Sequence, residues 1–216
     1  MNGKDGRLGV TKQPTIHNFN YSLEMSHRAS DLPFWEPVYR DAFPTMEAMV
    51  DHRGDGEHQR AGIDRSIILA NSKQILIDEK VRFKDYGDIL LEYWSNAERK
   101  VPGWVCKPLR ADFIAYAIAP AGKCYLLPVL QLQRAWEIHG DEWKRKYKPR
   151  KALNENGNGN GRYTTICLAI SVGTLFSAIG NCLRIYFEPL VPNETKSMCP
   201  PALKQAEIFP YDKPPF

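Results

Sequence analysis

The chain has 216 residues, of which 43% are hydrophobic and 25% are charged, and its formal net charge is +4. This length suits one α/β core with extensions, and this composition is typical of a globular protein rather than a disordered or fibrous one. A net charge of +4 is too small to indicate a nucleic-acid partner by itself, so local clusters of charge are more informative.

The cysteines favour a reducing compartment. They number five and include no C-x-x-C pair, which argues against a zinc knuckle or a disulfide framework and favours free thiols. The first 25 residues contain no apolar segment of signal-peptide length. We therefore do not expect secretion and predict a cytoplasmic protein.

The first 30 residues are polar and predict a loosely attached N-terminal arm. A single α/β domain is expected over residues 31–187. Residues 188–216 hold seven of the 16 prolines and predict an extended C-terminal segment.

Helical and strand patterns alternate within this domain. Residues 35–50 have the apolar face of a helix, which Pro44 must kink or divide. A polar loop at residues 53–60 follows. Residues 63–70 and 74–82 then predict two strands joined by a tight turn at residues 71–73.

Further strands and helices complete the expected sheet. Residues 88–96 predict a third strand, and residues 111–120 and 123–129 predict another hairpin, followed by a helix from Pro128. The Asn- and Gly-rich residues 154–161 predict a loop. The pattern as a whole predicts an α/β fold with a mixed central sheet flanked by helices.

Residues 163–183 carry no charge and are long enough to cross a bilayer. They contain several serines and threonines, and they divide into a β-branched segment at residues 164–170 and a helical segment from Val172. We therefore expect a buried strand and helix and no membrane partner, with a transmembrane helix as the alternative.

Charged residues interrupt the strand pattern of residues 62–82, GIDRSIILANSKQILIDEKVR. Alternate residues of a strand face the same side, so Asp78 and Lys80 share one face while Glu79 lies on the other, apolar face. If the hairpin closes at residues 71–73, Asp64 lies in the same cross-strand row as Asp78.

Two neighbouring carboxylates repel each other unless a positive charge lies between them. Oxygen ligands from one or two carboxylates, completed by water, are what Mg²⁺ uses in proteins. Lys80 on the same face is suited to orient or deprotonate a water, or to stabilise charge on a phosphoryl group. The pattern therefore predicts a metal site for phosphodiester hydrolysis.

Asp64, followed by Asp78-Glu79-Lys80, resembles the signature of the PD-(D/E)XK nuclease superfamily, although Ile63 stands where the family has proline. This resemblance implies a restriction-endonuclease-like core over about residues 35–135. It assigns Asp64 and Asp78 as acidic ligands and Lys80 as the lysine.

The same resemblance implies further ligands. Glu47 or Asp51 would be the acid of the preceding helix, Glu92 an additional ligand, and Glu79 a ligand through its backbone carbonyl. The implied activity is a DNA endonuclease that depends on Mg²⁺ or Mn²⁺. The resemblance also implies a homodimer as the form that cuts two strands.

Several polar and basic residues are candidates for binding DNA. Gln59 precedes the first strand of the hairpin, and Arg65 and Arg82 lie within it. Residues 141–151 hold a basic run with interleaved aromatic rings, which suits phosphate binding and base stacking; its candidates are Lys144, Arg145, Lys146 and Lys148.

Other readings of these residues stay open. Asp64 and Lys80 are also explained by an exposed cross-strand ion pair, and Arg65 and Arg82 by solvated or ion-paired side chains. Glu79 fits either a ligand or a residue at the edge of the sheet. For the whole chain, the alternative is a non-catalytic nucleic-acid-binding or assembly protein that keeps the nuclease-like fold.

Overall fold

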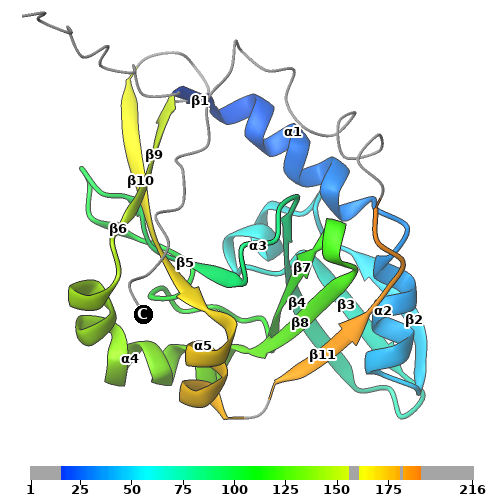
Figure 1. The fold of residues 1–216 in the computed structure, drawn as a ribbon. Helices are drawn as coiled ribbons and strands as arrows, with labels where there is room; N and C mark the ends of the chain where they lie inside the picture. Colours follow the sequence, from blue (N-terminus) through cyan, green and yellow to red (C-terminus); the bar gives the residue numbers. More distant parts are fainter. Residues whose placement is uncertain (1–15, 156–160, 181, 191–216) are drawn as a thin grey trace, which may run out of the picture.

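The computed structural model describes residues 16–155, 161–180 and 182–190, which form a mixed α/β fold with two sheets (Figure 1). The larger sheet has six strands in the order β11-β8-β7-β4-β3-β2. Its neighbouring strands are antiparallel except for β4 and β7, which are parallel. The strands are β2 (Met46–Asp51), β3 (Arg65–Leu69), β4 (Gln74–Arg82), β7 (Phe113–Ile118), β8 (Lys123–Pro128) and β11 (Leu183–Tyr186).

The smaller sheet has five strands in the order β1-β9-β10-β5-β6. It contains β1 (Ile16–Asn18), β5 (Asp88–Asn96), β6 (Val101–Pro102), β9 (Arg150–Glu155) and β10 (Arg162–Ser171). The predicted third strand, β5, therefore joins this second sheet and not the sheet of the β3–β4 hairpin. The parallel connection from β4 to β7 consequently runs through β5 and β6, where a helix is the usual crossover.

Five α-helices surround the two sheets in the described part of the chain. They are α1 (Phe19–Ser30), α2 (Trp35–Ala42), α3 (Gly56–Arg60), α4 (Val129–Lys146) and α5 (Val172–Ile179). A short 3-10 helix, η1 (Ala119–Ala121), turns the β7–β8 hairpin. The mixed sheet and flanking helices expected from the sequence are present.

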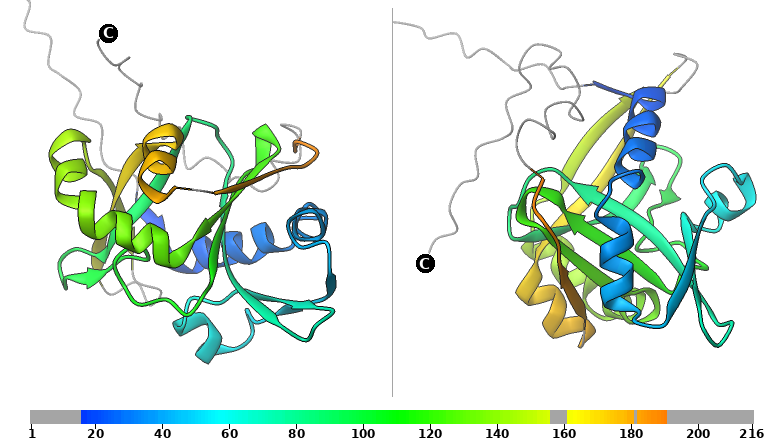
Figure 2. Two further views of the ribbon diagram at one scale, coloured as in Figure 1. Left: turned by 90° about the horizontal axis from the view of Figure 1, so that it is seen from below. Right: turned by 90° about the vertical axis from the view of Figure 1, so that its right-hand side faces the viewer.

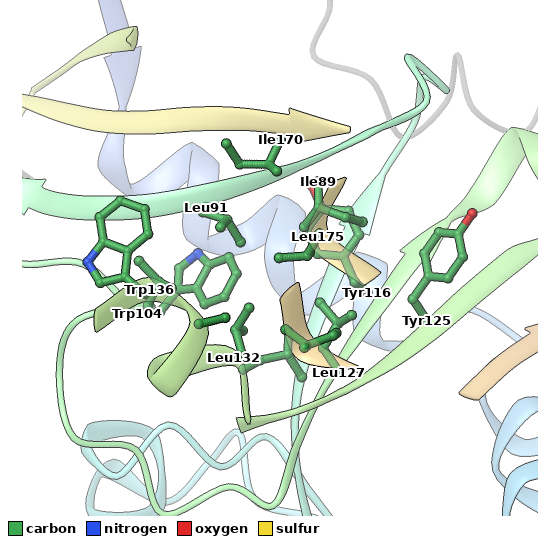
Figure 3. Close-up of a cluster of buried hydrophobic side chains, with 14 of the residues drawn as sticks. Ile89, Leu91, Trp104, Tyr116, Tyr125, Leu127, Leu132, Trp136, Ile170 and Leu175 are labelled. Carbon is green, nitrogen blue, oxygen red and sulfur yellow. The ribbon is translucent and has the colours of Figure 1, made fainter. Parts of the chain in front are cut away.

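Two hydrophobic cores lie on opposite faces of the six-stranded sheet. On one face, Trp35, Val38 and Tyr39 of α2 pack against Ile67 and Ile77. The other core joins this sheet to α4, α5 and the five-stranded sheet, and Figure 3 shows its side chains. Because β4 belongs to the sheet that separates these cores, protein covers both of its faces over much of its length.

The β3–β4 hairpin forms as the sequence predicts. Arg65 pairs with Ile77 and Ile68 with Gln74. In the turn, Ser72 has a left-handed backbone with φ of 61°. The side chain of Asn71 accepts a hydrogen bond of 3.1 Å from the backbone N–H of Lys73, which is a common way for asparagine to stabilise a turn.

The helix predicted for residues 35–50 is correct only as far as α2. After Pro44 the chain forms β2, the edge strand that pairs with β3. Proline disfavours helical backbone at the preceding residue and cannot donate an N–H, and the chain does not resume a helix after it. The prediction that Glu47 lies on a helix is therefore wrong.

The prediction of a loose arm over residues 1–30 is also wrong from Ile16 onward. Residues 16–18 form β1, and α1 runs from the five-stranded sheet to the six-stranded sheet (Figures 1 and 2). Ala29 and Ser30 at its end are buried. Residues 1–15 and 191–216, with most of the predicted C-terminal segment, lie outside the described residues, as do residues 156–160 of the predicted loop.

The uncharged stretch of residues 163–183 forms a strand and a helix, β10 and α5, as expected. Among the helices that the structure describes, none combines the length and apolarity needed to cross a bilayer. Cys106, Cys124, Cys167 and Cys182 are free thiols, in agreement with the sequence analysis; Cys199 lies outside the described residues.

Candidate functional site

Asp64 lies directly before β3, opposite Asp78 on β4. The last β3–β4 pair is Arg65 with Ile77, and the backbone N–H of Asp64 donates to the Ile77 carbonyl over 2.8 Å. The backbone N–H of Glu79 donates to Asp64 Oδ2 over 2.8 Å. The Asp64 side chain thus extends the hydrogen bonding between β3 and β4 beyond their last residue pair. This confirms the cross-strand row that the sequence predicted.

Lys80 forms an ion pair with the buried acid of this row. Its Nζ donates to Asp78 Oδ1 and lies 3.4 Å from the backbone carbonyl oxygen of Glu79. Asp78 is only 4% exposed, whereas the side chain of Lys80 is 32% exposed. The lysine therefore stands between a buried carboxylate and solvent.

Burial and charge perturb both members of this pair. Burial raises the pKa of Asp78 to about 7; the Lys80 ammonium opposes the rise, and the Asp64 carboxylate adds to it. Burial lowers the pKa of Lys80, but the negative charges of Asp78 and Asp64 outweigh burial and raise it above its ordinary value. The pKa of Asp78 is thus raised mainly because its carboxyl group is buried, and the neighbouring acid adds to the rise.

Two members of this cluster, Asp64 and Lys80, lie at a cleft of about 430 Å³ between the two sheets, and the buried Asp78 is not one of its lining residues. Asp64 and Lys80 line it from the hairpin, and Leu90, Glu92 and Cys167 line it from the five-stranded sheet. The second half of α1 closes another side through Met25, Ser26, Ala29 and Ser30. Trp104 and Tyr116 complete much of its apolar wall.

Glu92 lies on the cleft wall that faces Lys80. Burial raises the pKa of Glu92, and the positive charge of Lys80 opposes that rise. Gly103 packs closely against the backbone of β5 at Glu92. A Cβ at position 103 would lie 2.3 Å from the Glu92 carbonyl oxygen. Only glycine permits this approach without displacing β5.

The side chain of Glu79 does not belong to this cluster. It points to the opposite face of β4, where its carboxylate accepts from Arg65 Nε over 2.6 Å and from the Tyr39 hydroxyl over 2.7 Å. Arg65 also donates to the Ser30 carbonyl over 2.7 Å. Since Arg65 is 5% exposed, the structure contradicts its predicted role in binding nucleic acid. For Glu79, the backbone N–H and carbonyl contact Asp64 and Lys80 of the site, and the carboxylate does not.

Arg82 is likewise engaged within the protein. It forms an ion pair with Asp88 at the start of β5 and donates to the Asp88 carbonyl oxygen over 3.0 Å. Burial lowers the pKa of Arg82, but contacts with Tyr116 and Asp88 outweigh burial and raise it. Arg82 therefore joins the two sheets beside the cleft, and its predicted role in binding phosphate is not supported by its contacts.

Glu47 and Gln59 lie away from the acidic cluster. Glu47 is exposed on β2 beside Met46, which pairs with Leu69 at the opposite end of β3 from Asp64. The Gln59 amide on α3 donates to the Arg53 carbonyl over 2.6 Å. Asp51, the other candidate for a helical acid, forms an ion pair with Arg53.

The predicted basic run lies mainly on the far side of the five-stranded sheet. α4 packs with Ile89 and Leu91 of β5, whereas Leu90 and Glu92 face the cleft. Lys144 lies 5.4 Å from the Trp136 ring centroid and 3.0 Å from Asp141 Oδ1. Arg145, Lys146 and Lys148 are exposed at or just after the end of α4, so the structure does not bring these side chains to the acidic cluster.

The donors in the cluster fit a hard divalent cation. Asp64, Asp78 and the Glu79 carbonyl offer oxygen atoms only, and Asp78 is buried beside a second acid. Mg²⁺ is held in this way by one or two carboxylates, with water completing its shell. Within the described ranges, no group of three or more His, Cys, Asp or Glu side chains is placed to hold a metal ion, so the site offers two carboxylates and a carbonyl.

Comparisons with protein-family models, with curated proteins and with solved structures give no match to this chain. The function is therefore inferred from the residues of the site. Its main groups, Asp64, Asp78 and Lys80, were found from strand periodicity. The cleft walls from α1 and β10 were missed, because a pattern of local sequence does not show which distant segments meet.

Proposed function

We propose that this chain is a divalent-cation-dependent nuclease of the PD-(D/E)XK type, with a restriction-endonuclease-like core, that hydrolyses phosphodiester bonds in DNA. The observation that carries the proposal is the row of Asp64, Asp78 and Lys80 at the cleft. Two adjacent acids, one of them buried, with a lysine between them and solvent, cost the fold more than exposed or apolar alternatives would, which favours a functional role.

Each group has a distinct role in the proposed reaction. Asp64, Asp78 and the Glu79 carbonyl would hold Mg²⁺ or Mn²⁺. The cation would supply Lewis-acid stabilisation of phosphoryl oxygens and activation of water. Lys80 orients the Asp78 carboxylate through its hydrogen bond and presents a donor to the negative charge that develops on the phosphate.

The buried surroundings strengthen these interactions. Charges interact more strongly where water is partly excluded, and Asp78 is almost fully buried. Glu92 faces Lys80 across the cleft and is a further candidate ligand. The Glu79–Arg65–Tyr39 network on the opposite face holds the β4 backbone from which Asp78 and Lys80 project.

A cleavage assay tests this proposal. Purified full-length protein is incubated with labelled DNA, both single-stranded and duplex, with Mg²⁺, with Mn²⁺ or with EDTA. Cleavage is expected only with a cation. Lys80→Ala and Asp64→Asn are each expected to reduce the rate at least about 100-fold, whereas the exposed control changes Lys73→Ala and Asp41→Asn leave it unchanged.

A binding measurement separates loss of chemistry from loss of the cation. Mn²⁺ is expected to raise the melting temperature of the unaltered protein and of Lys73→Ala, but not that of Asp78→Asn. DNA binding without cleavage under any of these conditions would favour the non-catalytic alternative. Cleavage that survives both Lys80→Ala and Asp64→Asn would overturn the assignment.

A further inference from the structure

Helix α1 spans the cleft and is held at both ends. At its start, β1 pairs in parallel with β9 on the five-stranded sheet, and α1 begins at the next residue. At its end, the Ser30 carbonyl accepts from Arg65 on β3 over 2.7 Å. The His27 carbonyl accepts from Arg53 over 2.6 Å. The helix is therefore a fixed strap between the two sheets (Figures 1 and 2).

This strap limits the width of a ligand that can reach Asp64 and Lys80. Met25, Ser26, Ala29 and Ser30 of α1 line the same cleft as Asp64 and Lys80. Its volume of about 430 Å³ is that of a pocket for one small ligand, and one or two nucleotides are ligands of that size. Duplex DNA, whose major groove alone is about 12 Å wide, is too broad to enter.

The five-stranded sheet supplies a wall suited to a nucleic-acid strand. Cys167 of β10 lines the cleft and pairs with Glu92 on one side and with Arg150 on the other. Residues paired across neighbouring strands lie on the same face, so Arg150 belongs to the cleft face. Its side chain is exposed, and within the described residues it forms no salt bridge.

Tyr163 lies further along the same face. It is four residues before Cys167 on β10, in unbroken register with β9, and pairs with Asn154. Burial raises the pKa of the Tyr163 phenol, and the negative charge of Glu92 adds to the rise. Tyr163 and Arg150 therefore lie on one face of the sheet, four paired positions apart. Partly exposed rings and cations along one face are the combination on which unpaired bases stack and their phosphates bind.

We propose that the substrate is an unpaired DNA strand that lies on this face of the five-stranded sheet, beneath α1, with Arg150 binding a phosphate and Tyr163 stacking on a base. The proposal rests on the proposed nuclease function for the cleavage step, but its binding step is independent of that function. It assigns a role to Arg150 that the exposed cations of α4 do not share.

Binding to DNA tests the proposal without cleavage. Full-length Lys80→Ala protein in EDTA is titrated into a fluorescently labelled single-stranded 20-mer and into the same sequence as a duplex. The single strand is expected to bind at least about tenfold more tightly. Equal or tighter binding of the duplex would overturn the proposal.

The two faces of β9 provide a matched pair of variants. Arg150→Ala removes a cation from the cleft face, while Lys151→Ala removes one from the opposite face, where Lys151 pairs with Ile166. Arg150→Ala and Tyr163→Ala are each expected to weaken single-strand binding about tenfold. Lys151→Ala and the exposed Tyr186→Ala are expected to change it less than twofold. Equal effects of Arg150→Ala and Lys151→Ala would overturn the assigned face.

A change on α1 tests whether the strand lies beneath the strap. Ser26→Trp fills the cleft side of the helix and is expected to weaken single-strand binding more than tenfold. Arg28→Trp, at an exposed position that pairs with Glu24, is the control. Unchanged binding by Ser26→Trp would overturn the path beneath α1.

The outcomes also distinguish this proposal from the proposed nuclease function. If no DNA is cleaved in any metal but single strands bind through Arg150, the nuclease function fails and the binding proposal stands. If the unaltered protein cleaves duplex DNA in Mn²⁺ at least as fast as single strands, the nuclease function stands and the substrate proposal fails.

Discussion

The two faces of β4 carry similar charges but differ in what surrounds them. On one face, Glu79 is paired with Arg65, and its side chain is 1% exposed; Tyr39 supplies a second donor. On the other face, Asp78 has Lys80 as its cation but a second acid, Asp64, beside it, and Lys80 reaches the cleft. The first face has matched donors and acceptors, whereas the second has two acids for one lysine, and Asp64 and Lys80 line the cleft.

This difference separates a structural ion pair from a candidate catalytic one. A buried pair with complete hydrogen bonding holds its neighbours in place, and removal of one partner is costly. Repulsion between two neighbouring carboxylates lowers the stability of the folded state. Reduced stability of this kind is common at functional sites. Loss of charge should therefore reduce stability much more on the Glu79 face than on the Asp78 face.

Arg65→Ala is expected to have the largest effect on stability. It leaves the Glu79 carboxylate buried without its cation, which should lower the free energy of unfolding by about 3–5 kcal/mol. Urea denaturation at pH 7 measures this loss. As controls, Arg40→Ala at the exposed pair with Glu36 should cost less than about 1 kcal/mol, and combining Arg65→Met with Glu79→Leu should recover most of the loss. A cost near that of Arg40→Ala would contradict the structural role.

Arg82→Ala is expected to have an intermediate effect. It removes the ion pair with Asp88 and the hydrogen bond to the Asp88 carbonyl, which together join β4 to β5. The expected loss is about 2 kcal/mol, the usual range for hydrogen bonds to charged groups. The same denaturation assay, with Asp88→Asn as a partner variant, measures it. If Arg82→Ala weakens DNA binding but leaves stability unchanged, Arg82 is a phosphate ligand after all.

Asp78→Asn should change stability by less than about 1 kcal/mol in the absence of metal. The variant loses the ion pair with Lys80 but also loses the repulsion from Asp64, and these effects oppose each other. Thermal unfolding in EDTA gives the comparison, and Glu79→Gln serves as the matched change on the opposite face, where a larger loss is expected. A loss for Asp78→Asn as large as that for Arg65→Ala would show that Asp78 is a structural acid.

The exposed pair of Asp51 and Arg53 should show the smallest effect. Hydrogen bonding to Arg53 lowers the pKa of Asp51 to about 2 from the ordinary 3.8. Since the folded-state pKa is the lower one, the stabilisation is present above about pH 4 and is lost as the pH falls toward 2. The Asp51 side chain is 38% exposed, so Asp51→Asn should cost below about 1 kcal/mol at pH 7. That cost should fall to a small fraction of its pH 7 value near pH 2, where the folded-state carboxyl is half protonated. Acid titrations of both proteins measure this, and an undiminished difference at pH 2 would point to a cause other than charge.

Strand periodicity predicted correctly which side chains of β4 share a face. The alternation of Ile75, Ile77 and Val81 with Asp78 and Lys80 is local information, and the turn at Ser72 set the register that brings Asp64 opposite Asp78. The partner of Glu79 was not predictable in the same way. Tyr39 is 40 positions away in the chain, and only packing of α2 on the sheet brings its hydroxyl to the carboxylate.

The elements that sequence reasoning misplaced are those whose neighbours are distant. The apolar spacing of residues 46–50 fits either a helix or a strand. These residues form a strand because they pair with β3. The first described residues, from Ile16, are rich in polar side chains. Nevertheless β1 pairs with β9, and the end of α1 accepts a hydrogen bond from Arg65. Tertiary contacts of this kind override local preference.

The placement of the acidic cluster along the chain bears on the order in which the protein folds. Asp64, Asp78, Lys80 and Glu92 all come from one continuous segment, and contacts between residues close in sequence form fastest. The walls that enclose them, α1 and β10, come from opposite ends of the described chain. The hairpin and its charges should therefore assemble early and the cleft should close late. A nascent chain would then form the acidic cluster before it forms the walls that restrict access to that cluster.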